Sequence, residues 1–253
     1  MAFMDKLAHA DGSSTQSDLA YEALLAEILE CRLAPGAKII ISDTAGRLGF
    51  SPGAVREALS RLAAERWTVA TAQKGYSVTQ VSADELKDLT RTRITIEQLC
   101  MRAAIAHGDV EWETHLVAAY HRLHRIPMMD AQGGSRVNPA WAVAHTTFHA
   151  ALVAGCDSPW MLTLRSMLYV QSERYRHLSA ALTRESRDVD AEHKRILDSC
   201  LARDPEGACA AIQDHLQQTA QIVLTSPRFR EWQLDPQRAE PEFATERVGG
   251  QRS

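Results

Sequence analysis

The spacing of apolar residues divides the chain into two regions, one of short mixed elements and one of helices only. Between about residues 17 and 80 the predicted elements are short. They are a helix over 18–32, a second helix that opens near residue 42, and a third within "GFSPGAVREALSRL" at 49–62. "WTVATAQKGYSV" follows, two β-rich runs separated by a turn that ends in Gly75, and it predicts a small hairpin. Three short helices and a hairpin are the element order of a winged helix-turn-helix module.

From residue 82 onward only helical periodicity is present. Ser82 and Glu85 predict a capping box for a helix that runs to about residue 107, and Asp109 can cap the next helix. Three further helix starts place a capping side chain directly before a proline: Asn138-Pro139, Ser158-Pro159 and Asp204-Pro205. With one more helix near 188–202, six helices joined by mostly short loops predict an antiparallel all-α bundle.

We therefore predict a mainly α protein in which a winged helix-turn-helix domain over 17–80 precedes a helical domain over 82–225. Small polar residues make 1–16 a flexible N-terminus, and the prolines and glycines after residue 226 make 226–253 a flexible tail.

Composition and charge narrow the classes of function. The formal net charge is −4, so any affinity for nucleic acid must be local. Five scattered cysteines without a CxxC pair indicate reduced thiols rather than a disulfide framework or a cysteine zinc site. The chain has neither a signal-like start nor an apolar run of 18 residues, which favours a cytoplasmic protein with no membrane partner.

A local positive bias does occur in the third predicted helix and its surroundings. The segment from residue 47 to residue 74 contains five basic residues and only two acidic ones. Ser51 can cap the helix and leave backbone N–H groups available to phosphate. On their own, Arg56 and Arg61 fit an ordinary solvated helix face better than a DNA contact, and the order of helices, glycine turn and hairpin favours the DNA contact.

"LGFSPGAVREALSRLAAERWTVATAQKGYSV" resembles the signature of the GntR family of winged-helix repressors, in which "VREAL-RL" lies in the recognition helix. The resemblance implies that a homodimer binds a palindromic double-stranded DNA operator. The expected DNA-binding residues are Arg47, Ser51, Gly53, Arg56, Arg61, Lys74 and Gly75, with Lys74-Gly75 at the tip of the wing. Many members carry arginine-threonine where this chain has Pro52-Gly53, so the operator of relatives does not transfer to it.

Four of the ten histidines stand at suggestive positions. His145 and His149 are four residues apart on one helix face, and His193 and His215 lie on the last two bundle helices. Two ligands from one helix and one from each of two others can form a metal site, and neutral imidazoles suit Zn²⁺ or Ni²⁺. Spacing alone does not separate this site from ordinary core or surface histidines.

"AHTTFHAALVAG", followed by "EHKRIL" and "DHLQQT", is similar to the FCD effector domain that accompanies one large branch of GntR regulators. That resemblance covers residues 82 to about 224 and implies metal ligands at His145, His149, His193 and His215. His145 stands where metal-binding members carry an aspartate, so a ligand is kept but a negative charge is lost.

The same resemblance assigns the arginine of the first bundle helix to Arg93. The functional interpretation is a forked contact with the carboxylate of a small effector, a dicarboxylate in our expectation; the alternative is an internal pair with Glu97. Gln171 and Arg174, on the long central helix, are expected to add polar contacts to the effector.

These features predict a ligand-responsive transcriptional regulator, more often a repressor, and not an enzyme. A metal-dependent hydrolytic enzyme is the first alternative, although no HExxH-type general base accompanies the histidines. In the second alternative the helical domain only dimerises and its metal is structural.

Overall fold

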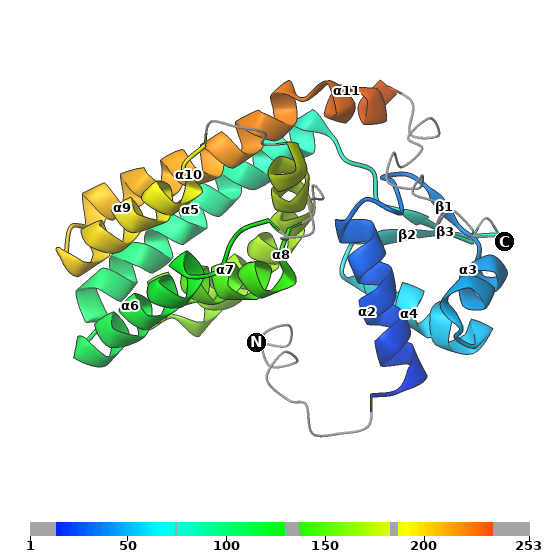
Figure 1. Cartoon of the computed structure of the whole chain (residues 1–253), viewed down its shortest axis with the longest axis horizontal. Helices are drawn as coiled ribbons and strands as arrows, with labels where there is room; N and C mark the ends of the chain where they lie inside the picture. The colour runs from blue at the N-terminus through cyan, green and yellow to red at the C-terminus, as the bar shows by residue number, and fades with distance from the viewer. Residues whose placement is uncertain (1–13, 74, 130–136, 183–186, 235–253) are drawn as a thin grey trace, which may run out of the picture. The chain divides into compact units, whose positions relative to one another are not determined.

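The computed structural model describes residues 14–73, 75–129, 137–182 and 187–234. These residues form two compact units. One unit holds Ala83–Ser226, and the other holds the preceding residues together with those from Pro227 onward. The elements of both units are labelled in Figure 1.

Ahead of the helical domain, the described helices of the N-terminal unit are α2 (Gln16–Leu29), α3 (Ile41–Leu48) and α4 (Pro52–Ala64). A capping box between Thr15 and Asp18 begins α2. Gly49 ends α3 at a φ of 73°, in the left-handed region that glycine adopts without strain. The tight turn leads to Ser51, whose hydroxyl caps α4 by accepting from Ala54 N at 3.2 Å.

The apolar residues of α4 hold this unit together. Val55, Leu59 and Leu62 are fully buried because α4 packs against both α2 and α3. The three-stranded sheet consists of β1 (Lys38–Ile39), β2 (Thr68–Thr71) and β3 (Gly75–Val78), in the order β1-β3-β2 with antiparallel pairs. The predicted winged helix-turn-helix is confirmed, and the short edge strand β1 was not predicted.

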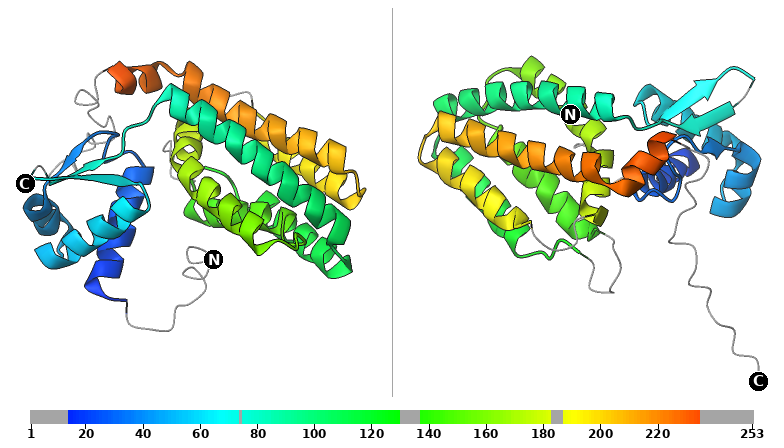
Figure 2. Two further views of the ribbon diagram at one scale, coloured as in Figure 1. Left: turned by 180° about the vertical axis from the view of Figure 1, so that it is seen from behind. Right: turned by 90° about the horizontal axis from the view of Figure 1, so that it is seen from above.

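Within the described residues, the second unit has the six predicted helices, five at the capping signals and one at the helix expected near 188–202. They are α5 (Ala83–His107), α6 (Val110–His124), α7 (Pro139–Leu152), α8 (Pro159–Leu182), α9 (Val189–Leu201) and α10 (Pro205–Thr225). Asp109, Asn138 and Asp204 each accept a backbone N–H of the following turn, as their sequence positions predict. Figure 2 shows α5 and α10 side by side, and the two helices pack together. Within the described chain, no helix is both long enough and apolar enough to cross a membrane.

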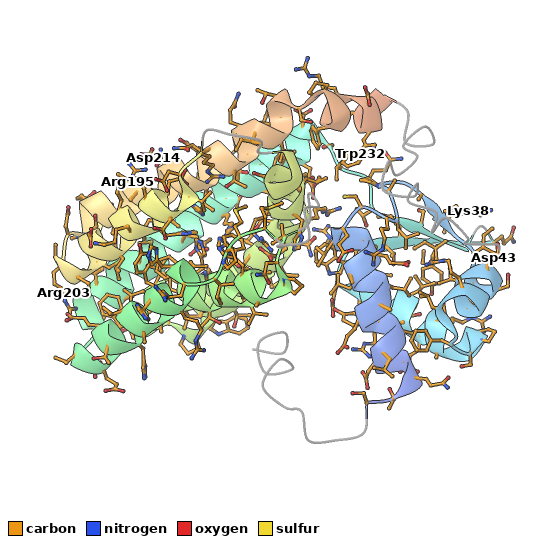
Figure 3. The ribbon with its side chains drawn as sticks, viewed as in Figure 1. Lys38, Asp43, Arg195, Arg203, Asp214 and Trp232 are labelled. Carbon is orange, nitrogen blue, oxygen red and sulfur yellow. The ribbon has the colours of Figure 1, made fainter. Side chains whose placement is uncertain are left out.

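The end of the described chain differs from our expectation of a flexible tail from residue 226. Pro227–Leu234 forms α11, which belongs to the N-terminal unit. Its Phe229 and Trp232 are only 1% and 5% exposed, and Trp232 is labelled in Figure 3. Two aromatic rings three residues apart on one helix face gain enough from burial to order this short segment. The predicted tail from 235 onward and the predicted flexible residues 1–13 lie outside the described residues.

The bundle core needs a glycine where the turn after α7 approaches α5. A Cβ atom at Gly155 would stand 2.8 Å from the carbonyl oxygen of Ala104 and 3.0 Å from the Cα atom of Gly108. Both neighbours are backbone atoms of a packed helix end, so neither can move aside cheaply.

We expect Gly155→Ala to lower the free energy of unfolding by about 1–3 kcal/mol, the usual cost of overpacking. Urea denaturation followed by circular dichroism measures the loss. The exposed neighbour provides the control, because Ala154→Ser should change stability by less than about 0.5 kcal/mol. Equal stability of the two variants would contradict the close approach.

Candidate metal centre and nucleic-acid interface

Three helices bring the four predicted histidines to one point in the bundle core. His145 and His149 come from α7, His193 from α9 and His215 from α10, and one ring nitrogen of each lies within 4.8 Å of the others. None of the four is more than 4% exposed. Neighbouring Arg195 and Asp214 instead lie on the outer surface of α9 and α10 (Figure 3). Helical spacing therefore places the histidines in the interior and these two charged neighbours outside.

The buried imidazoles have unmet bonding capacity. Among the described residues, neither ring nitrogen of His149 and not the Nε2 atom of His193 has a hydrogen-bond partner. A buried nitrogen without a partner costs about 1–3 kcal/mol, so a protein core rarely keeps several together. A metal ion would satisfy one nitrogen of His149 and the Nε2 atom of His193 together, and the four-histidine cluster is therefore suited to hold one.

Polar groups outside the cluster orient two of the rings. Nδ1 of His215 donates to Glu192 at 2.8 Å, and Nδ1 of His145 lies 3.4 Å from the hydroxyl of Tyr169. Because Nδ1 is engaged in each of these rings, Nε2 is the nitrogen that remains available as a metal ligand, as in many metal-bound histidines. Arg187 fixes Glu192 in turn through two hydrogen bonds of 2.8 and 2.7 Å.

The sequence pattern did not reveal this support. Glu192 is adjacent to His193 in sequence but lies on a different face of α9, and that face meets α10 and the ring of His215. The adjacent histidine was the available signal, and only the packing of α9 on α10 gives it meaning.

Burial controls protonation in the cluster. It lowers the pKa values of His145, His149 and His193 well below the ordinary value, and neighbouring cationic groups lower them further. Burial also opposes the ionisation of Glu192, but hydrogen bonds from Arg187 and His215 outweigh it and lower the pKa of Glu192 to about 2. Neutral imidazoles beside an ionised carboxylate are the protonation states that metal ligation requires.

A small cavity of about 30 Å³ connects the cluster to Arg93, and this volume accommodates about two water molecules. Its polar lining includes Arg93, Ser172, Arg176, His145 and His215, and its apolar lining includes Leu86, Leu216 and Ala220. Among the described lining residues, Arg93 is present as predicted, but Gln171 and Arg174 are absent. The buried Arg174 lies 3.6 Å from Glu85 instead.

The alternative pairing of Arg93 with Glu97 is present but weak. Nε of Arg93 stands 3.4 Å from Glu97, whereas Arg165 holds the other oxygen of the same carboxylate at 2.9 Å. Nη1 of Arg93 donates to the Ser172 hydroxyl at 2.6 Å, and its guanidinium lies 4.8 Å from the ring centre of Tyr169. Two buried arginines thus share one carboxylate, and the charge of Arg93 is only partly compensated.

In the N-terminal unit, α4 exposes the surface expected to meet DNA. Ser51, Gly53 and Arg56 are exposed, while the apolar residues between them point into the core. The Ser60 hydroxyl lies 2.9 Å from the hydroxyl of Tyr76 on β3, so the exposed side of α4 is joined to the wing. Gly75, at a φ of 84°, begins β3.

The other predicted contacts differ in their surroundings. Arg47 holds Glu27 through both terminal nitrogens. Arg61 donates to Asp18 at 2.8 Å and lies over the ring of Tyr21, and this hydrogen bond lowers the pKa of Asp18 to about 2. Lys74 lies outside the described residues. Among the predicted arginines that the structure describes, Arg56 is the one whose side chain is exposed without an ion pair.

A winged helix with an exposed α4, next in sequence to a helical domain, is the architecture of a DNA-binding transcriptional regulator. Residues 16–78 match the bacterial regulatory proteins of the gntR family, and residues 88–218 match the FCD domain. The chain belongs to the GntR family, in the branch that carries an FCD domain. Members bind DNA operators and commonly act as dimers.

Two relatives cover most of the chain. The HTH-type transcriptional regulator BphR of Paraburkholderia xenovorans is 38% identical over 203 residues, which cover 80% of this chain and 83% of the relative. The HTH-type transcriptional repressor GlaR of Escherichia coli is 34% identical over 200 residues, which cover 78% and 90%. The family and these relatives are transcriptional regulators, so the metalloenzyme alternative does not hold for this chain.

Solved structures share the fold. The E. coli protein McbR/YncC aligns with a TM-score of 0.63 at 20% identity, covering 82% of this chain and 96% of its own. A GntR regulator from Rhodococcus sp. RHA1 aligns with a TM-score of 0.61, also at 20% identity, covering 83% and 98%.

Metal should stabilise the wild-type bundle through the buried imidazoles. Adding Zn²⁺ at 100 times its Kd to chelator-treated protein should increase the free energy of unfolding by about 2.7 kcal/mol, seen as a higher Tm. His149→Ala should abolish this response, because His149 supplies a fully buried ligand. His115→Ala, on an exposed face of α6, should retain it. Absence of metal uptake by the wild-type protein would contradict the site.

Proposed function

We propose that this GntR regulator is a dimeric repressor whose helical domain binds a divalent metal and a small dicarboxylate effector, and that effector binding changes its affinity for a palindromic operator. The observation that supports this function is one cavity lined by Arg93 and by two histidines of the buried cluster, His145 and His215. The cavity lies between a guanidinium and the histidines that would hold the metal, and both the guanidinium and the metal can bind an anion.

His145, His149, His193 and His215 would hold the metal, with Zn²⁺ or Ni²⁺ the ions that imidazole ligands suit best. The bound ion would supply a Lewis-acidic, positively charged contact for an effector oxygen. The chain's own residues do the rest: Glu192 and Tyr169 orient two rings, and burial keeps all four imidazoles neutral.

The charges around the cavity favour a dianion. Neutral ligands leave the ion's charge uncompensated, and Arg93 shares its only carboxylate partner among the described residues with Arg165. An effector with one carboxylate toward the metal and one toward Arg93 would relieve both deficits. A monocarboxylic acid would relieve one, and an amine would add to the repulsion.

The small cavity gives a physical reason for a response to the effector. A dicarboxylate of four to six carbons occupies several times the volume of the water molecules that about 30 Å³ can hold. Side chains of α5, α8 and α10 line the cavity and must move when such a ligand enters. Binding therefore favours a different packing of these helices, which is the differential interaction that a regulatory switch needs.

We expect Arg56→Ala to weaken operator binding by about 1–3 kcal/mol, the scale of one base or charged phosphate contact. The measurement is fluorescence anisotropy at fixed salt, with a duplex selected from random sequence by the wild-type protein. Arg122→Ala removes the same charge from the exposed surface of α6 and should leave affinity unchanged.

Arg61→Ala provides a second comparison in that assay. Because Arg61 is bound to Asp18 and Tyr21, its loss should lower the stability of the N-terminal unit more than DNA affinity. An Arg56→Ala variant that binds the duplex like wild type would refute the assignment of α4.

A thermal-shift screen of the metal-loaded protein tests the effector. Dicarboxylates of four to six carbons should raise Tm more than the monoacids or diamines of matched length, with a stabilisation of about 2.7 kcal/mol at 100 times Kd. Arg93→Ala should remove the preference for diacids. Arg102→Ala, which alters an exposed arginine of the same helix paired with Glu206, should preserve it. Monoacids that match the best diacid would leave the structural-metal alternative in place.

A further inference from the structure

A second arginine, Arg176 on α8, lines the cavity together with Arg93, His145 and His215. Its side chain is 9% exposed, and its guanidinium lies 5.7 Å from the ring centre of Trp141. Trp141 stacks on His145 with ring centres 4.7 Å apart, so Arg176 is positioned by a residue that also packs on the metal cluster. None of the roles derived above uses Arg176.

Glu173 fixes the plane of this guanidinium. Nε and Nη2 of Arg176 each donate to a different oxygen of Glu173 at 2.8 Å, and Nη2 also lies 2.9 Å from Nε2 of His177. Burial opposes both charges, but the pair outweighs it, so the pKa of Glu173 is lowered and that of Arg176 is raised. The bidentate geometry leaves the remaining nitrogen, Nη1, directed away from Glu173.

Nη1 of Arg176 is buried, and within the described part of the chain it has no hydrogen-bond partner. A buried charged donor that goes unused is costly, and proteins keep such groups where a ligand completes the bonding. The positive charges of Arg176 and Arg93 both lower the pKa of Glu173, so the two guanidiniums lie near the same carboxylate. Two cationic donors, one partly compensated and one with an open N–H, thus border one cavity.

We propose that Arg176 is a second anchor for the effector and that the distal carboxylate of a dicarboxylate binds between Arg93 and Nη1 of Arg176. This inference rests on the proposed function, because it requires the diacid site between Arg93 and the metal. It also replaces Arg174 by Arg176 as the arginine of α8 that selects the ligand. The two-guanidinium contact specifies a second ionised carboxylate, and a methyl group in its place leaves both donors unsatisfied.

The test measures Kd by isothermal titration calorimetry on zinc-loaded full-length protein. The probes are succinate, glutarate and adipate, each with its matched monoacid, namely butanoate, pentanoate and hexanoate. Arg176→Lys keeps the charge but removes the forked donor, and it should weaken the tightest diacid by about tenfold or more. The matched monoacid, which lacks the distal carboxylate, should change by less than about twofold.

Arg174→Lys is the control, because it makes the same change two residues away on α8 at a buried position absent from the described cavity lining. Its diacid Kd should stay within about twofold of wild type. If Arg174→Lys weakens the diacid and Arg176→Lys does not, the proposal is overturned in favour of Arg174. Equal losses for diacid and monoacid in Arg176→Lys would show a structural role and would also overturn it.

Glu173→Gln provides an independent test with the opposite sign, which also serves if Arg176→Lys fails to fold. Removing the carboxylate charge leaves Arg176 uncompensated in the free protein, so the diacid should bind about threefold tighter or better, while the monoacid should not. Unchanged or weaker diacid binding would overturn the proposal. A wild-type protein that takes up zinc but binds none of the three diacids refutes the proposed effector class itself, whereas normal wild-type binding with an unaffected Arg176→Lys variant refutes only the role of Arg176.

Discussion

Four imidazoles buried at the junction of α7, α9 and α10 impose the main constraint on the helical domain. A core can tolerate a histidine whose two nitrogens are bonded, but here His149 has no partner for either nitrogen among the described residues. One ring nitrogen of each histidine lies within 4.8 Å of the others, and outside packing only His215 and His145 are held by polar contacts among the described residues, to Glu192 and Tyr169. The domain therefore holds a buried cluster of imidazoles that could bind a metal ion.

Two arrangements of charge surround the cluster. On one side, Arg187 and Glu192 hold His215 through a chain of charged hydrogen bonds. On the other side, the buried arginines Arg93, Arg165 and Arg176 pair with only two carboxylates among the described residues, because Glu97 serves two guanidiniums and Glu173 serves the third. The first arrangement orients ligands, and the second leaves positive potential for an anion. A metal that was only structural would need the first arrangement and not the second.

A similar division between internal and available charge occurs in the DNA-binding unit. Arg47 and Arg61 join α3 and α4 to α2 through Glu27 and Asp18, so their charges contribute to the assembly of the unit. Arg56 is left on the exposed side of the recognition helix. A count of basic residues treats all three alike, yet an arginine already paired with a carboxylate must give up or share that partner before it can bind phosphate.

The sequence alone determined the elements and singled out the four histidines that the bundle core brings together. Asp109, Asn138 and Asp204 mark helix starts because caps and N1 prolines act within one turn, and His145 and His149 share a face because helical spacing is local. Tertiary structure decided which long-range partners meet. Glu192 contacts His215, and Arg176 rather than Arg174 lines the cavity. Burial of Phe229 and Trp232 orders α11. These outcomes depend on helix packing and on competition for buried partners, which residue spacing along one chain does not encode.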